Sequence, residues 1–132
     1  MTTEKTLRCV NSCGFLNSNQ YEGVEVEVCP QCKGIWLSFD NLNQIIRTQR
    51  RVWTETQKAE ILPQTGKTGV PQEELEQHRD CPECGELMPA FNYQYSSGII
   101  INKCKHNHGL WLDRGELNKI QIYKEAPNNF NV

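Results

Sequence analysis

The chain has 132 residues, 37% of them apolar, and a formal net charge of -2. This length suits one ordinary domain or two very small ones. No apolar run approaches the roughly 20 residues that cross a bilayer, and residues 1–8 lack the apolar core of a secretory signal, so we expect a soluble, cytoplasmic protein. The slightly acidic balance argues against a general electrostatic attraction to nucleic acid.

The chain contains seven cysteines, and six of them form three close pairs. An odd number is unsuited to a disulfide framework, and paired cysteines in a cytosolic chain more often bind metal. Metal binding is therefore the favoured interpretation.

The first half, residues 1–62, begins with the pair Cys9 and Cys13. Residues 24–28 alternate valine with glutamate, which is the period-two pattern of a strand with one buried face. The pair Cys29 and Cys32 follows this strand directly. A hairpin between two cysteine turns is the structure we expect here.

A long helix is predicted after this second pair. Ser38 suits its N-cap, and no Gly or Pro interrupts the chain before Pro63, so the helix could extend to about Leu62. Its apolar stripe consists of Leu42, Ile45, Ile46, Val52, Trp53 and Ala59. The stripe is longer than one small unit can cover, so we expect it to pack on the second half or on another chain.

The same helix carries a basic face. Its residues are Arg47, Arg50, Arg51 and Lys58, with Glu55 as the one acidic residue nearby. Together with Trp53 they are candidates for contact with an acidic partner or with phosphate; a solvated helix face is the alternative.

Residues 63–79 combine two prolines, two glycines and a short acidic run, which predicts a flexible linker with one helical turn near residues 72–77. The second half, residues 80–125, begins with the pair Cys81 and Cys84. Residues 91–101 contain a strand, a Ser-Ser-Gly turn and a returning strand. Asp113 suits the N-cap of a shorter helix over about 114–124, with Glu116 at its third position. We expect residues 126–132 to form a flexible tail.

The two halves are copies of one unit. The segment that begins at Cys29 recurs 75 residues later at Cys104, and the glycine, the Trp-Leu pair and later apolar residues recur in the same register. Trp36 and Trp111 are predicted to be core residues, each packed across its own hairpin. Each preceding glycine, Gly34 or Gly109, is predicted to permit the turn after the last ligand.

Two cysteine turns can supply the four ligands of a structural zinc site. We assign Cys9, Cys13, Cys29 and Cys32 to one Zn²⁺, and Cys81, Cys84, Cys104 and His108 to a second. A rubredoxin-like iron is the alternative metal for the first site. His108 is preferred over His106 because one intervening residue leaves too little chain for both side chains to reach one ion. His106 remains the alternative, and His78 is expected to be a solvated linker residue.

The pattern Cys81-Pro82-Glu83-Cys84, a hairpin, a second turn and then Gly109-Leu110-Trp111-Leu112-Asp113-Arg114-Gly115-Glu116-Leu117 resembles the transcription-factor-IIB-type zinc-ribbon family of small prokaryotic proteins. The resemblance is strong over residues 81–122 and weaker over 9–46, where the spacing and the Asp-x-Gly-Glu turn differ. It implies an α+β fold of two tandem zinc ribbons, each an antiparallel β-hairpin with a C-terminal helix and structural zinc.

The predicted function is a non-enzymatic, zinc-binding adaptor that contacts a protein partner through the long helix, which could also form a homodimer. Four protein ligands leave no open position for catalysis at either metal. A nucleic-acid-binding or transcription-associated ribbon is the first alternative. A switch in which oxidation of the thiolates releases zinc is the second.

Overall fold

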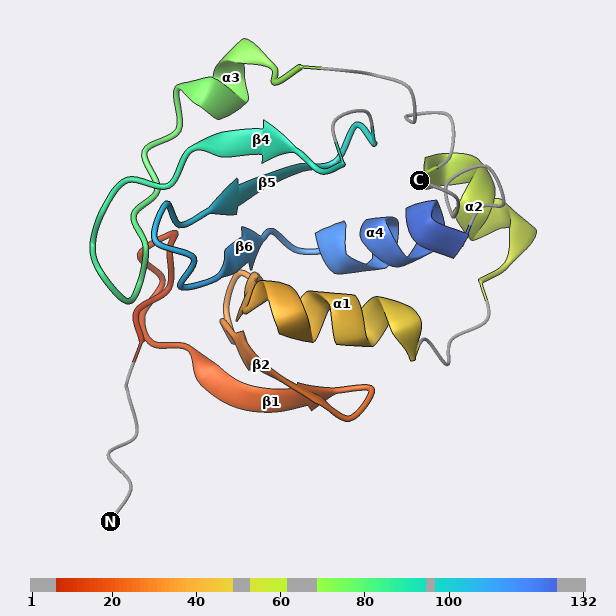
Figure 1. Ribbon diagram of the computed structural model, residues 1–132, viewed down its shortest axis with the longest axis horizontal. Coiled ribbons are helices and arrows are strands. Elements are labelled where there is room, and N and C mark those ends of the chain that lie inside the picture. Colours follow the sequence, from red (N-terminus) through yellow and green to blue (C-terminus); the bar gives the residue numbers. More distant parts are fainter. Residues whose placement is uncertain (1–6, 49–52, 62–68, 95–96, 126–132) are drawn as a thin grey trace.

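The computed structural model describes residues 7–48, 53–61, 69–94 and 97–125. Its elements form a small α+β fold around one six-stranded sheet (Figure 1). In chain order they are β1 (Asn17–Tyr21), β2 (Val24–Val28), β3 (Ile35–Leu37), α1 (Phe39–Arg47), α2 (Glu55–Ile61), α3 (Gln72–Leu75), β4 (Ala90–Asn92), β5 (Ile100–Lys103), β6 (Leu110–Leu112) and α4 (Glu116–Glu125). We found no helix among the described residues that is long and apolar enough to span a bilayer.

The sheet joins the two copies edge to edge. Its strand order is β1-β2-β3-β6-β5-β4, and every neighbouring pair is antiparallel. At the centre β3 pairs with β6, with Trp36 opposite Trp111. This register relates the copies by an approximate twofold axis through the tryptophan pair. Each predicted hairpin therefore gains a third strand, and that strand pairs with the other copy.

The two faces of the sheet carry different cores. One face packs against the helices in a cluster that includes Val26 and Leu42 from the first copy and Ile101 and Leu117 from the second (Figure 1). The other face carries Trp36, Trp111 and the buried cysteines. Because valine and glutamate alternate along β2, its valines turn towards the helices and its glutamates towards the opposite face.

The predicted N-cap of the first helix is confirmed, whereas α4 begins at Glu116 and the carboxylate of the predicted N-cap, Asp113, bonds to Arg79 and Trp111 instead. The Ser38 hydroxyl accepts a hydrogen bond from the Asn41 backbone N–H at 3.0 Å, which makes Ser38 the N-cap of α1. At α4 the Glu116 carboxylate accepts the Asp113 backbone N–H at 2.7 Å, which is one half of a capping box.

The predicted helix to about Leu62 is wrong, because two shorter helices occupy this part of the chain. α1 ends at Arg47, and α2 begins only at Glu55. Thr54 and Gln57 form a reciprocal capping box: the Thr54 N–H donates to Gln57 Oε1 at 2.9 Å, and the Gln57 N–H donates to Thr54 Oγ1 at 3.1 Å. This local signal starts a new helix. Three members of the apolar stripe pack within the chain, since Leu42 and Ile45 are fully buried and Trp53 is 5% exposed. Ala59 is exposed, and Val52 lies outside the described residues.

The described end of the expected linker is tied to the second copy. It includes the predicted helical turn as α3, and Asn92 Nδ2 donates to the Gly69 carbonyl at 3.1 Å. The Arg79 guanidinium donates to Asn102 Oδ1 at 3.0 Å. Residues 63–68 and the predicted tail lie outside the described residues, so the domain boundaries remain a prediction.

Candidate metal centres

The first cysteine cluster has the geometry of a zinc site. The sulfur atoms of Cys9, Cys13, Cys29 and Cys32 all lie within 4.8 Å of one another. The Cys9 and Cys32 sulfurs are 3.6 Å apart. A tetrahedral zinc with bonds of about 2.3 Å to sulfur separates its ligand atoms by about 3.8 Å, so this cluster fits one Zn²⁺.

The second cluster has the same size with a histidine in the fourth position. Cys81, Cys84, Cys104 and His108 bring their ligand atoms within 4.8 Å of one another. His108 Nδ1 lies 3.3 Å from the Cys104 sulfur and 3.8 Å from the Cys81 sulfur. The chain therefore offers two zinc sites, one with four thiolates and one with three thiolates and an imidazole.

The other two histidines face carboxylates. His106 Nε2 contacts Glu86 Oε2 rather than the cysteine cluster. His78 is exposed, and its Nε2 lies 3.0 Å from Asp80 Oδ1. Of the two histidines near Cys104, the structure thus brings His108 to the cluster and leaves His106 outside it.

Each site is built from two turns of different length. The shorter turn has two residues between its two ligands, and the longer turn has three. In the shorter turns the left-handed residue follows the second ligand: Lys33 (φ 65°) follows Cys32, and Gly85 (φ 78°) follows Cys84. In the longer turns it comes before the ligand: Ser12 (φ 63°) precedes Cys13, and Asn107 (φ 61°) precedes His108. Moving the left-handed residue by one position lets either spacing present two ligands to one ion.

Backbone hydrogen bonds to sulfur make the ligands unequal. Although burial raises the pKa of Cys29, N–H donors from Cys32 and Gln31 outweigh it and lower that pKa to about 7. The pKa of Cys104 is lowered in the same way to about 6, whereas burial raises the pKa of both Cys9 and Cys81 to about 12. A divalent cation offsets the repulsion between clustered thiolates and allows them all to lose their protons.

The tryptophans are core residues, as predicted, but each packs against the other copy. Trp36 is 3% exposed and Trp111 is fully buried. A Cβ added to Gly34 would lie 2.1 Å from Trp111 Cζ2, and one added to Gly109 would lie 2.7 Å from Trp36 Cζ2. The predicted role of these glycines in the turn is wrong, because Lys33 and Asn107 have the left-handed conformation. The missing side chains make room for the opposite indoles.

The predicted basic face is not a single surface. Arg47 is exposed near the end of α1, whereas Lys58 belongs to α2 and lies 3.9 Å from Glu55. Trp53 is buried, which removes it from the candidates for partner contact. Arg50 and Arg51 lie outside the described residues, so their predicted role is not addressed by the structure.

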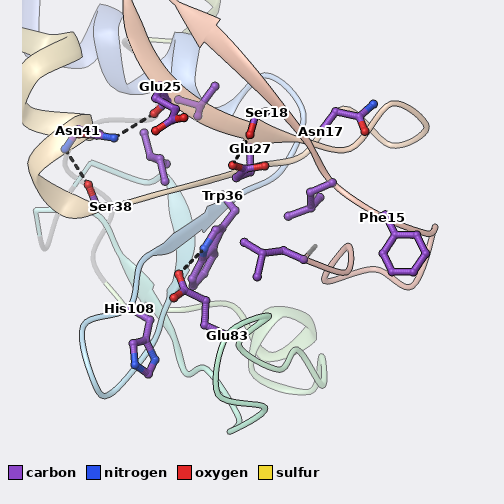
Figure 2. Close-up of a pocket in the computed structure, with 14 residues that line it drawn as sticks. Phe15, Asn17, Ser18, Glu25, Glu27, Trp36, Ser38, Asn41, Glu83 and His108 are labelled. Carbon is purple, nitrogen blue, oxygen red and sulfur yellow. Dashed lines mark hydrogen bonds between the residues drawn. The ribbon is translucent and has the colours of Figure 1, made fainter. Parts of the chain in front are cut away.

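A groove of about 650 Å³ lies on the first copy, between Phe15 and the start of α1 at Ser38 and Asn41, and Glu83 and His108 of the second copy also line it. Its floor includes Leu16 and Trp36, and its lining includes the carboxylates of Glu25, Glu27 and Glu83 (Figure 2). The Trp36 indole N–H donates to Glu83 Oε2 at 3.1 Å, which ties one wall to the second copy.

The groove is open at Phe15, whose side chain is 51% exposed and stacks under the Arg8 guanidinium at 5.0 Å. Sequence reasoning missed this groove. Its one signal was the alternation along residues 24–28, which places Glu25 and Glu27 together on the face away from the helices.

Comparison with known proteins identifies one family. The model of the family described as "Transcription factor zinc-finger" matches residues 11–48 and 80–121, one match in each copy. No curated protein and no solved structure matches the chain.

Proposed function

Because the chain belongs to the transcription factor zinc-finger family, we propose that it is a non-enzymatic zinc-binding adaptor that contacts a protein partner. In this proposal both zinc ions are structural. Each would be bound by four side chains of the chain, which completes a tetrahedron and leaves no position for a substrate or an activated water. A reducing compartment such as the cytoplasm would keep the thiols available for metal.

The acidic groove is the observation that supports a protein partner. It combines a small apolar floor with three glutamates, and Phe15 is half exposed at its mouth. Exposed aromatic side chains beside charged rims are typical of protein interfaces. The predicted long helix does not support this proposal, because α1 and α2 are separate and Leu42, Ile45 and Trp53 of its apolar stripe are buried inside the chain.

Nucleic-acid binding is the second candidate, and the family's description favours it. The charges oppose it: the net charge is -2, and the groove is lined by carboxylates, which repel phosphate. Arg47 and Lys58, the two described members of the predicted basic face, lie on different helices.

Two measurements separate these candidates. The zinc-loaded chain is titrated with labelled duplex DNA, single-stranded DNA and RNA at low salt, and it is also used as bait in cell lysate with and without nuclease. We expect no nucleic-acid binding, and retained proteins that are identical with and without nuclease. Binding with a steep salt dependence, or partners that disappear with nuclease, would replace the adaptor by a nucleic-acid-binding protein.

A further inference from the structure

The approximate twofold symmetry shows how one face of the sheet is covered in each copy. The Leu7 carbonyl accepts the Leu16 N–H at 2.8 Å, and the Arg79 carbonyl accepts the Met88 N–H at 2.8 Å, so Leu7 and Arg79 occupy equivalent positions. By the same register Glu27 is equivalent to Asn102, since each lies opposite the tryptophan of its own copy.

In the second copy a segment of the chain itself covers this face. The Arg79 side chain is 11% exposed, and its Nη1 donates to Asn102 Oδ1 at 3.0 Å and to Asp113 Oδ2 at 2.7 Å. Gly69, further back in the same segment, accepts a hydrogen bond from Asn92 on β4. Arg79 and the segment before it, which includes α3, thus complete this side of the second copy.

Among the described residues of the first copy, no arginine occupies this place. Leu7 stands in the position of Arg79, and a carboxylate, Glu27, stands in the position of the Asn102 amide. The face that Arg79 covers in the second copy is therefore left open as the groove in the first. The described residues that line the groove include three glutamates and no lysine or arginine. Glu27 accepts a hydrogen bond from the Ser18 hydroxyl at 2.8 Å, which orients the carboxylate within the groove (Figure 2).

We propose that this groove binds an arginine-bearing segment of a protein partner, with the guanidinium paired to Glu27. The partner would supply a guanidinium to the first copy, as Arg79 supplies one within the second copy. A guanidinium matches a carboxylate better than it matches the amide that it already contacts at Asn102. This inference rests on the proposed adaptor function and names the chemistry of its partner.

The test uses the full zinc-loaded chain and a fluorescein-labelled peptide of alternating arginine and leucine. The matched probe replaces each arginine by citrulline, which keeps the shape and removes the charge. We expect the arginine peptide to bind about tenfold more tightly than the citrulline peptide, and Glu27→Gln to remove most of that difference. Glu73→Gln, at an exposed position of α3, is the control and should change nothing.

The site is located by the indole N–H signals in an NMR titration. The Trp36 signal should shift, because its indole lines the groove, whereas the Trp111 signal should stay, because that indole donates to Asp113. Equal affinity for both peptides, or equal losses in E27Q and E73Q, would overturn the proposal and indicate only a general attraction to an acidic chain.

The lysate experiment separates this inference from the adaptor function. We expect the wild-type bait to retain proteins that the E27Q bait loses. If both baits retain the same proteins, the groove is not the docking site, while the adaptor function stands. If the wild-type bait retains no protein, the adaptor function itself fails.

Discussion

Each of the four ligand turns depends on the position of one left-handed residue. In the aligned repeat Asn107 stands at the position of Cys32, and His108 stands at the position of Lys33. The left-handed residue is Lys33 in the first copy and Asn107, one position earlier, in the second. The fourth ligand accordingly lies one position later in the second copy, at His108. The missing eighth cysteine is therefore replaced by a histidine one place further on. The longer turn at Cys13 has the same conformation, with Ser12 as the left-handed residue before the ligand.

Replacing the two histidines separately tests this assignment. His108→Ala should lower the zinc content from two ions per chain to about one, because the second cluster keeps only three ligands. His106→Ala should keep both ions, because its imidazole faces Glu86. Elemental analysis after dialysis against a weak chelator gives the count. Loss of zinc from the His106 variant alone would reverse the assignment.

The side chain of Glu116 makes the stability of the fold depend on pH. Burial raises its pKa from 4.5 to about 8, although the Asp113 N–H hydrogen bond acts in the opposite direction. The folded chain thus holds a proton that the unfolded chain releases above about pH 4.5, and the free energy of unfolding falls as the pH rises towards 8.

We expect the zinc-loaded chain to lose about 2 kcal/mol more stability between pH 6 and pH 8 than Glu116→Gln, which keeps an oxygen acceptor for the Asp113 N–H. Urea unfolding at both pH values measures the difference. Identical losses in the two proteins would show that Glu116 is already ionised when folded.

At the scale of elements, the central strand pair depends on two reciprocal contacts. Trp111 fills the space over Gly34, and Trp36 fills the space over Gly109. Each glycine is therefore needed by the other copy, which explains why the Gly-x-Trp-Leu segment occurs in both.

Gly34→Ala should destabilise the chain by about 3 kcal/mol, because the new methyl group would overlap the Trp111 indole. In Trp111→Leu, which removes the overlapping ring, the same alanine should cost far less. Thermal unfolding of the two single variants and the double variant gives this coupling. Additive losses would place the cause in the backbone of Gly34 rather than in its contact with the indole.

At the scale of the whole molecule, the shared sheet makes the two zinc sites interdependent. β3 and β6 pair across the copies, and one apolar cluster contains residues of both halves. A half that loses its metal loses the strand that borders the other half. The two sites should therefore respond to metal removal as a coupled unit.

The coupling can be measured by removing one ligand from each site in turn. Cys13→Ser should weaken zinc binding at the second site by about tenfold or more, and Cys84→Ser should weaken the first site by the same factor, since thermodynamic coupling is reciprocal. Competition with a coloured chelator measures both affinities. An unchanged affinity at the intact site would mean that the halves fold independently.

The ligand pairs, the internal repeat, the hairpin strands and the N-cap at Ser38 could be predicted from the sequence, because each depends on residues close together in the chain. The predicted helix to Leu62 is wrong because a second local signal, the capping box of Thr54 and Gln57, competes with the apolar stripe. The pairing of β3 with β6, the exchange of tryptophans and the acidic groove depend on residues of both copies. Only the tertiary structure decides these features, since strand pairing and burial across the copies are long-range interactions that no local pattern specifies.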